Sequence, residues 1–298
     1  GTDRTADGIS NPYSICSWNP DMYGVNPDAE GAQAYFDSIF QLYAQWGVDF
    51  IKCDDICRMD AASAKEEIRM LHEAINKSGR QMVLSLSPGP ARLKEAWHYE
   101  TYSNMWRITD DFWDDWNLLK QMFERCEHWQ NHVGKGNYPD CDMLPVGMLG
   151  KGFGEERLTR FTRDEQITMM SLWCIFRSPL MIGAELTHLD EWTKTLLTNP
   201  EILALLSDDC KASQLARDGK HCIWHSSDQR SGFNYLAVFN LMEEEREIDI
   251  SASLLDKEGL RGICFKELWT GETFTNPSKD LIAKVPGHGA RICRYKET

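Results

Sequence analysis

Residues 1–206 combine two hydrophobic periodicities. Apolar side chains recur every three or four positions, which predicts amphipathic helices over residues 28–46, 62–78, 91–99, 112–132, 162–176 and 189–206. Short apolar runs bounded by glycine, proline or charged residues lie between them and predict strands over residues 48–54, 82–87, 102–107, 139–145 and 178–183. Because strands that alternate with helices pair in parallel, we expect an α/β domain here.

The pattern changes after residue 206. Short alternating segments separated by turn residues predict strands over residues 235–239, 247–250, 265–269 and 290–293. Such strands are typical of an antiparallel sandwich. We therefore expect an all-β domain over residues 207–298, which follows the α/β domain of residues 1–206.

The α/β domain is expected to hold about five parallel strands, whereas a closed parallel barrel needs eight. Either its sheet is open or three further strand–helix units lie upstream of Gly1. The opening Gly1-Thr2-Asp3-Arg4 is typical of a cut, a processed end or an expression boundary. If the units lie upstream, that segment is needed to complete the barrel, and a targeting segment would not be visible in this chain.

Composition and charge narrow the class of protein. The chain has 298 residues, of which 42% are hydrophobic and 26% charged, as in ordinary soluble globular proteins. Its formal net charge of −14 excludes nucleic acid and anionic membranes as expected partners, and no apolar run is long enough to span a membrane. Ten cysteines without a CxxC pair argue against a zinc ribbon and favour a reducing, cytoplasmic compartment. Cys16 and Cys57 are the one pair considered for a disulfide.

Two clusters of charged residues follow predicted strands. In the first, Lys52 and Asp54 are two positions apart, so both side chains point to the same face of the strand. A lysine beside a carboxylate keeps that carboxylate ionised at neutral pH, which suits a nucleophile. A buried structural ion pair is an equally good interpretation of the same two residues.

The second cluster follows the strand that ends at Arg107. An arginine can hold sugar hydroxyls or a carboxylate with its planar set of donors. Asp110 or Asp111 supplies the second acid, and the pattern does not decide between them; Asp114 and Asp115 are expected in the first turn of the next helix. Because the carboxyl ends of parallel strands gather at one face, the two clusters predict acid–base and nucleophilic chemistry on a small polar substrate.

Other polar residues could form a metal site. Asp140 and Asp142 could add a third acidic contact or, with the other acids, bind a hard metal ion. The metal is the weaker interpretation because positive residues already neighbour the acids. His128 and His132 are four apart on a predicted helix and, without a third ligand, are expected to be a surface pair. We therefore expect neither a metal nor a cofactor.

Three segments resemble those of a known family: residues 43–54 (YAQWGVDFIKCD), Trp106-Arg107 followed by Asp111, and residues 139–144, with Cys141 in place of proline. They are similar to the nucleophile strand, the acid/base segment and the Asp-Pro-Asp-Met-Leu segment of glycoside hydrolase family 27, the α-galactosidase and α-N-acetylgalactosaminidase family. The resemblance covers nearly the whole chain. It implies a (β/α)8 TIM barrel followed by a C-terminal β-sandwich, and a glycosidase that retains configuration through a covalent intermediate.

The resemblance also implies roles for individual residues. Asp54 corresponds to the nucleophile and Asp111 to the general acid/base. The residues expected to contact the sugar are Lys52, Ser87, Arg107, Asp142 and Met143. The implied reaction removes terminal, non-reducing α-D-galactosyl residues from galactose-containing oligosaccharides or glycoconjugates and uses no cofactor.

Two departures from the family pattern bear on the substrate. Ser87 stands where the galactosidases carry a glutamate that faces the 2-position of the sugar, so α-N-acetylgalactosaminides become the alternative substrates. A serine is shorter and can donate to an acetamido carbonyl, which favours these substrates. Pro90 argues against them, because the N-acetyl-tolerant members carry a small alanine at that position. The family's acidic pair for the 4- and 6-hydroxyls is not found in this chain, which therefore resembles the latter part of a longer enzyme.

Two further classes of function stay open at this stage. One is a metal-dependent hydrolase that uses the aspartate clusters. The other is a catalytically incomplete protein that binds carbohydrate without hydrolysing it. Both predicted catalytic acids are present, which favours the enzyme.

Overall fold

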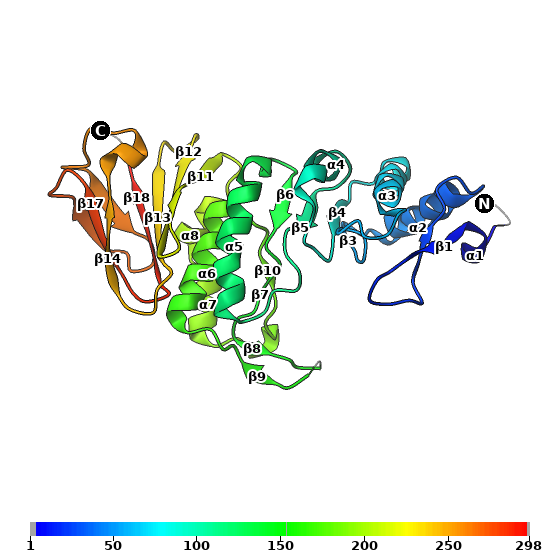
Figure 1. Ribbon diagram of the computed structural model, residues 1–298, viewed down its shortest axis with the longest axis horizontal. Coiled ribbons are helices and arrows are strands. Elements are labelled where there is room, and N and C mark those ends of the chain that lie inside the picture. The colour runs from blue at the N-terminus through cyan, green and yellow to red at the C-terminus, as the bar shows by residue number, and fades with distance from the viewer. Residues whose placement is uncertain (1–3, 153, 297–298) are drawn as a thin grey trace. The chain divides into compact units, whose positions relative to one another are not determined.

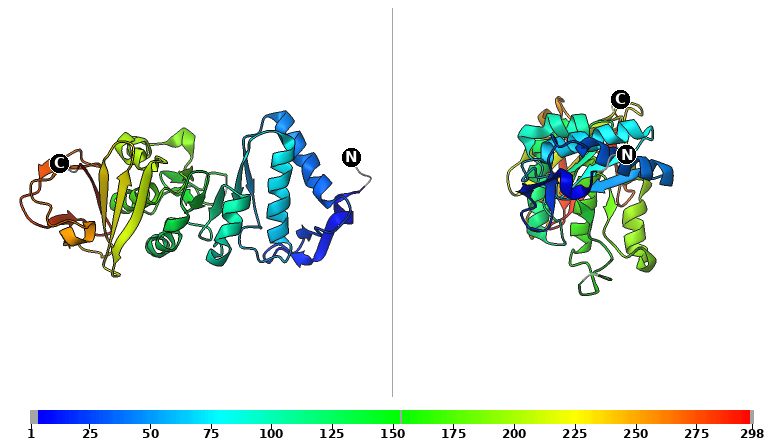
Figure 2. Two further views of the ribbon diagram at one scale, coloured as in Figure 1. Left: turned by 90° about the horizontal axis from the view of Figure 1, so that it is seen from above. Right: turned by 90° about the vertical axis from the view of Figure 1, so that its right-hand side faces the viewer.

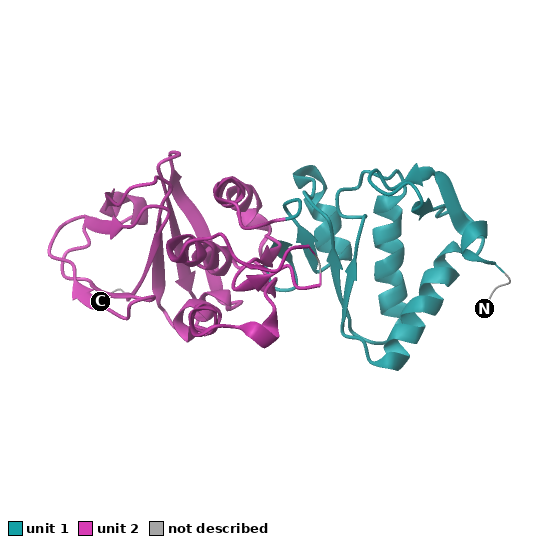
Figure 3. Cartoon of the chain, turned by 90° about the horizontal axis from the view of Figure 1, so that it is seen from below, with its two compact units in different colours: residues 1–111, 134–140 teal, residues 112–133, 141–298 magenta. Residues whose placement is uncertain are grey.

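The computed structural model describes residues 4–152 and 154–296, so the start of the chain at Gly1 lies outside the described residues. The chain divides into two compact units (Figure 3). The first comprises residues 1–111 and 134–140, and the second comprises residues 112–133 and 141–298. The first unit is therefore interrupted by a helical segment of the second.

A four-stranded parallel sheet forms the centre of the first unit (Figure 1). Its strands, in spatial order, are β3 (Phe50–Cys53), β4 (Val83–Leu86), β5 (Met105–Arg107) and β6 (Tyr138–Asp140). The helices that alternate with the strands are α2 (Ala32–Trp46), α3 (Ala64–Ser78) and α4 (Ala96–Tyr102), with the 3-10 turn η1 (Leu93–Glu95) before α4. The predicted alternation of strands and helices is confirmed for these elements.

Glycines fix the ends of the two long helices in this unit. Gly47 ends α2 at a φ of 75° and Gly79 ends α3 at a φ of 74°, a left-handed backbone that favours glycine. α2 begins at Ala32 rather than at the predicted Asp28, because the preceding residues form turns that end at Gly31 with a φ of 91°. The chain thus enters β3 through a sharply terminated helix.

Three N-terminal elements were not predicted from the sequence: α1 (Ala6–Ile9), β1 (Ser10–Ile15) and β2 (Tyr23–Val25). β1 and β2 pair antiparallel. Ser14 is buried and its Oγ lies 2.6 Å from Ser63 Oγ, whereas the neighbouring Tyr13 is 94% exposed. Pro12 and the lack of alternating apolar residues concealed β1 in the sequence.

The second unit contains helices and short strands. Its α-helices are α5 (Trp116–Trp129), α6 (Arg163–Phe176), α7 (Glu191–Thr198) and α8 (Pro200–Leu203), and its 3-10 turns are η2 (Gln130–His132), η3 (Leu186–His188), η4 (Ala204–Leu206) and η5 (Ala252–Leu255). β7 (Met143–Leu144) pairs in parallel with β10 (Met181–Ile182). β8 (Met148–Leu149) and β9 (Arg157–Leu158) form an antiparallel pair that was not predicted.

Side chains cap the two longest helices of this unit. Thr162 caps α6: its Oγ1 accepts the Glu165 amide at 3.2 Å, and Glu165 Oε2 accepts the Thr162 amide at 2.8 Å. Asp115 caps α5 by accepting the Asn117 amide at 2.7 Å. These bonds satisfy amides that the first helical turn leaves without an intrahelical partner.

Antiparallel strands make up the C-terminal part of the second unit (Figures 1 and 2). One sheet has the order β11 (Cys210–Arg217), β12 (His221–Asp228), β13 (Asn234–Asn240), β18 (Ala290–Tyr295), β15 (Cys264–Glu267) and β16 (Thr273–Thr275), and a second sheet pairs β14 (Arg246–Ile250) with β17 (Leu281–Val285). Leu236, Ile250 and Val285 belong to an apolar core built from both sheets, as expected for a sandwich. The domain boundary at residue 206 stays a prediction.

None of the helices in the described ranges is long and apolar enough to cross a membrane.

All ten cysteines are free thiols. Cys16 and Cys57, the pair considered for a disulfide, are therefore not bonded to each other. Burial raises the pKa of the Cys57 and Cys126 thiols, so both remain protonated at neutral pH. These residues pack as small hydrophobic side chains.

The prediction that Asp114 lies in the first turn of a helix is wrong. Asp114 precedes α5 and its side chain is buried, because Arg157 binds it with two hydrogen bonds of 2.5 and 2.8 Å. The Arg160 amide donates a third at 2.6 Å. Burial alone would raise the pKa of the Asp114 carboxyl, but these three bonds outweigh that effect and hold the pKa below its usual value. The partner is 43 residues away, so the local pattern could not reveal it.

Replacing Asp114 with asparagine should destabilise the protein by about 3 kcal/mol at pH 7, as expected when one partner of a buried ion pair is removed. The folded-state pKa lies below the unfolded value of about 3.9, so the ionised carboxylate stabilises the protein above that pH. This contribution is lost as the pH falls through the folded-state pKa. Urea unfolding of the wild type and D114N from pH 7 to pH 3 measures the difference.

The exposed Glu124 of α5 provides the matched control, E124Q, which should change the free energy of unfolding by less than about 0.5 kcal/mol. A D114N difference that stays constant down to pH 3, or that grows on acidification, would contradict the prediction.

Candidate active site

The carboxyl ends of three neighbouring strands bring predicted site residues to one edge of the sheet. Asp54 follows β3, Ser87 follows β4, and Arg107 ends β5. The strand register continues into the site, because the Ser87 amide donates to the Cys53 carbonyl at 3.0 Å. Parallel α/β sheets bind ligands at this edge.

Asp54 presents an exposed carboxylate that is held from one side. The fully buried Ser87 donates its hydroxyl hydrogen to Asp54 Oδ1 at 2.6 Å. Lys52 is exposed, and within the described residues no ion pair joins it to Asp54. The structural ion pair considered from the sequence is therefore not formed, and the Lys52 ammonium is accessible to a substrate hydroxyl.

Ser87 has a contact that the sequence did not suggest. Its predicted place is opposite the 2-position of a sugar, whereas the structure directs its hydroxyl to Asp54. A hydroxyl has one hydrogen, so Ser87 cannot donate to Asp54 and to an acetamido carbonyl at the same time. Its contact with substrate stays a prediction, and the observed contact fixes the orientation of the Asp54 carboxylate.

The two candidate acids after β5 pair with different arginines. The Arg107 side chain is buried, with 4% of the residue exposed, and its Nη2 lies 2.8 Å from Asp111 Oδ1. Arg58 Nη2 lies 2.8 Å from Asp110 Oδ1 instead. The geometry therefore connects Asp111, rather than Asp110, to the arginine at the strand end.

The loop after β4 supports the backbone of Arg107. The Ala91 amide donates to the Arg107 carbonyl at 2.8 Å, and the Cys57 thiol donates to the same oxygen at 3.6 Å. Gly89 lies so close that a Cβ atom there would overlap the carbonyl oxygens of Arg107 and Thr109. Sequence reasoning identified this segment only as a turn, because the approach of two strand ends leaves no local signal.

Asp142 and Met143 belong to the second unit. Asp142 is nearly buried, with a φ of 74°, and its Oδ2 accepts the Phe112 amide at 2.8 Å. Its carbonyl accepts the Trp173 indole hydrogen at 3.1 Å. Gly183 packs against Met143, since a Cβ there would lie 2.8 Å from the Met143 sulfur. Both predicted substrate residues are thus held in defined positions, and their contact with a sugar stays a prediction.

A cavity of about 100 Å³ lies beside Asp54. It is lined by Cys16, Cys53, Asp55 and Glu67 as well as other residues of the first unit. Burial, together with the charges of Glu67, Asp54 and Asp55, raises the pKa of the Cys53 thiol to about 12. Cys53 is therefore protonated at neutral pH and is no competitor of Asp54 as a nucleophile.

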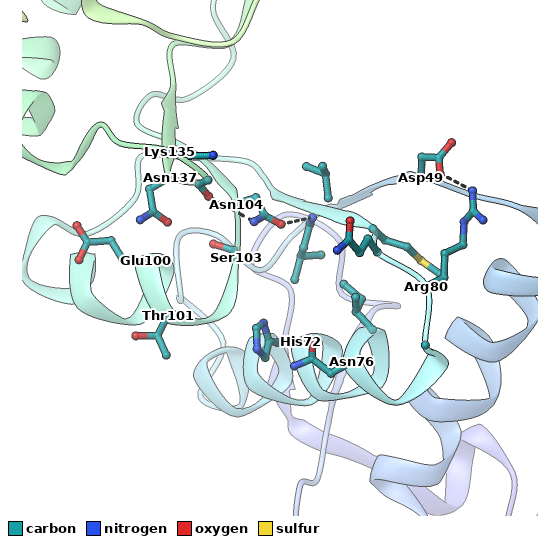
Figure 4. A pocket seen from close by; sticks show the side chains of 17 residues that line it. Asp49, His72, Asn76, Arg80, Glu100, Thr101, Ser103, Asn104, Lys135 and Asn137 are labelled. Carbon is teal, nitrogen blue, oxygen red and sulfur yellow. Dashed lines mark hydrogen bonds and ion pairs between the residues drawn. The ribbon is translucent and has the colours of Figure 1, made fainter. Parts of the chain in front are cut away.

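A much larger cavity, of about 870 Å³, lies at the opposite end of the sheet (Figure 4). Its lining includes Asp49, Asn104 and Asn137, which precede β3, β5 and β6. Arg80 pairs there with Asp49 at 2.5 Å. These are the amino ends of the strands, and ligand chemistry in parallel sheets belongs to the carboxyl ends, so this cavity is not the candidate active site.

The donors around the acids define the chemistry of the site. Within the described residues, no group of three or more histidine, cysteine, aspartate or glutamate side chains is placed to hold a metal ion. Asp54 instead accepts from a serine hydroxyl, and Asp111 from an arginine. Two exposed carboxylates thus lie at the ends of the alternate parallel strands β3 and β5, an arrangement that is compatible with acid–base and nucleophilic chemistry.

Comparison with known sequences specifies the family. The profile of the alpha-galactosidase A family matches residues 26–208, so the chain belongs to this family of glycoside hydrolases. Alpha-galactosidase 2 of Arabidopsis thaliana is 24% identical over 270 residues, which cover 88% of this chain and 63% of the relative. The chain thus spans less than two thirds of that relative.

Solved structures show the same relationship at higher identity. The chain is 46% identical to a family 27 β-L-arabinopyranosidase from Geobacillus stearothermophilus, with a TM-score of 0.93 over 100% of this chain and 69% of that one. It is 43% identical to a candidate α-N-acetylgalactosaminidase from Bacillus halodurans, with a TM-score of 0.84 over 100% of this chain and 70% of that one. The predicted fold class, a (β/α)8 barrel followed by a C-terminal β domain, is confirmed.

Replacing Gly89 with alanine should destabilise the first unit by about 1–3 kcal/mol, because the added methyl group forces the loop away from β5. The same movement should weaken the support of Arg107. Thermal unfolding of G89A measures the stability, and G8A is the matched control because a Cβ at Gly8 meets no atom within 4 Å. Equal melting temperatures of G89A and the wild type would contradict the predicted contact.

Proposed function

We propose that the protein is a retaining glycosidase that removes a terminal sugar of galactose configuration from a glycoside or oligosaccharide. The chain spans 63% of the length of one curated relative, so this activity is proposed for the whole protein. One observation carries the proposal: two exposed carboxylates, which follow the alternate strands β3 and β5, have different donors. Ser87 orients Asp54, and Arg107 binds Asp111.

In the first step, an oxygen of the Asp54 carboxylate forms a bond to the anomeric carbon as the bond from that carbon to the leaving oxygen breaks. Protonated Asp111 gives its proton to the leaving oxygen. The Ser87 hydroxyl holds one oxygen of Asp54, which leaves the other oxygen for the attack. The product of this step is a glycosyl ester on Asp54.

In the second step, the ionised Asp111 takes a proton from water, and the water oxygen forms a bond to the anomeric carbon. The ester bond to Asp54 breaks, and the sugar leaves with its original configuration. Arg107 Nη2 lies 2.8 Å from Asp111 Oδ1, so it is placed to orient this carboxyl group in both steps. Two inversions at one carbon give net retention.

The sugar that the protein removes is proposed from similarity and stereochemistry. The arabinopyranosidase is 46% identical to this chain, and Alpha-galactosidase 2 is 24% identical. β-L-Arabinopyranose and α-D-galactopyranose have the same configuration at the ring carbons and differ by one hydroxymethyl group. Lys52 and Arg107 can hold hydroxyls that both sugars share. We infer that β-L-arabinopyranosides are the preferred substrates and that α-D-galactosides, ranked first from the sequence, follow them.

The N-acetylgalactosaminides form a second candidate class of substrates. The 43% identity to the Bacillus halodurans protein and the small Ser87 favour them. The Ser87 hydrogen is nevertheless directed to Asp54, so it gives no added hydrogen bond to an acetamido group. We therefore place this class third.

Replacing Asp54 with asparagine in the full-length protein should lower kcat on any unactivated glycoside by at least about a thousandfold, because an amide cannot form the glycosyl ester. The kcat of D111N should fall by as much on an unactivated disaccharide. It should fall far less on a p-nitrophenyl glycoside, whose leaving group needs little protonation. E124Q, which replaces the exposed Glu124 of α5, is the matched control. Near-normal turnover of D54N or D111N on the disaccharide would exclude the assignment.

Steady-state kinetics with three p-nitrophenyl glycosides tests the preferred sugar. We expect kcat/KM on the β-L-arabinopyranoside to exceed that on the α-D-galactoside about tenfold, the discrimination that a pocket achieves against one extra carbon group. The α-N-acetylgalactosaminide should be the poorest of the three. A higher value for either of the other two substrates would reject the proposed order.

A further inference from the structure

An exposed tryptophan stands beside the residue that follows the nucleophile. Trp18 lies in the loop between β1 and β2, and its indole nitrogen donates to Asp55 Oδ1 at 2.5 Å. The residue is nevertheless 62% exposed. More than half of this fixed aromatic surface is accessible, so a ligand can pack against it.

The position of Asp55 brings this ring to the site. Asp55 has a φ of 62°, a left-handed backbone that non-glycine residues rarely adopt and that is often kept at functional sites. Trp18 and Asp55 line a small cavity of about 20 Å³. Asp55, Cys16 and Ala61 also line the cavity that contains Asp54, so the two cavities adjoin.

The same cavity extends toward the predicted acid. Arg58 lines it and binds Asp110 Oδ1 at 2.8 Å, and this oxygen also accepts the Asp111 amide at 2.9 Å. Arg58 uses Nη2 for this ion pair, and its side chain is 30% exposed. A guanidinium with a donor to spare can bind the hydroxyls of a sugar.

We propose that Trp18 and Arg58 form the subsite that binds the leaving-group sugar. Trp18 stacks against one face of a neutral pyranose, and Arg58 donates to its hydroxyls on the side of Asp111, which protonates the departing oxygen. The inference rests on the proposed glycosidase activity. Its ligand class is a neutral hexose or pentose joined to the terminal sugar through the bond that is cleaved.

Two substrates with the same terminal sugar isolate this subsite. The leaving group of melibiose is glucose, whereas that of α-D-galactosyl fluoride is a fluoride ion and not a sugar. In W18A the ratio of kcat/KM on melibiose to kcat/KM on the fluoride should fall about tenfold, as expected for the loss of one aromatic stacking contact. W18F keeps a ring and should restore most of the ratio, and R58Q should lower it.

Tyr13 offers the matched control. It lies on the same hairpin, is 94% exposed and lines neither of the two cavities. Y13A should leave the ratio unchanged. A ratio in W18A equal to that of the wild type, or equal losses on both substrates, would overturn the inference while the proposed function stands. Failure of the wild type to hydrolyse melibiose, the fluoride and p-nitrophenyl β-L-arabinopyranoside would overturn the proposed function and the inference with it.

Discussion

The parallel register of β3, β4 and β5 is the constraint on which the candidate active site depends. The ladder continues past the strands through the bond from the Ser87 amide to the Cys53 carbonyl, so the residues that follow each strand remain aligned. Ser87 can reach Asp54 only in this register, since a shift by one residue turns every side chain to the other face. Asp54, the proposed nucleophile, is therefore positioned by backbone pairing and not by a local motif.

The proposed catalytic carboxylates are exposed to solvent, whereas the side chains that hold them are buried. Ser87 and Arg107 are buried, and each makes a hydrogen bond to an exposed carboxylate. Buried polar groups with fixed partners have little conformational freedom. Their hydrogen bonds therefore hold the carboxylates in place while the carboxylates stay in contact with solvent. Gly89 contributes by allowing the loop after β4 to approach the end of β5. The site thus has rigid supports beneath accessible reactive groups.

The sequence predicted what depends on local periodicity and missed what depends on distant contacts. The alternation that places Lys52 and Asp54 on one face of the strand was readable from the sequence. The choice between Asp110 and Asp111 required two arginines that lie on different segments. Likewise, the bond from Trp18 to Asp55 spans 37 residues and the partner of Asp114 is 43 residues away, so neither leaves a signal in the local pattern.

The claim that Asp54 forms a glycosyl ester is tested most directly by trapping that ester. The full-length protein is incubated with a fluorinated galactosyl fluoride that slows the second step, and intact mass spectrometry with peptide mapping locates the adduct. We predict one sugar per chain, attached to Asp54, and no adduct on D54N. A sugar attached to another residue, or hydrolysis of this reagent with inverted configuration and no adduct, would contradict the proposed mechanism.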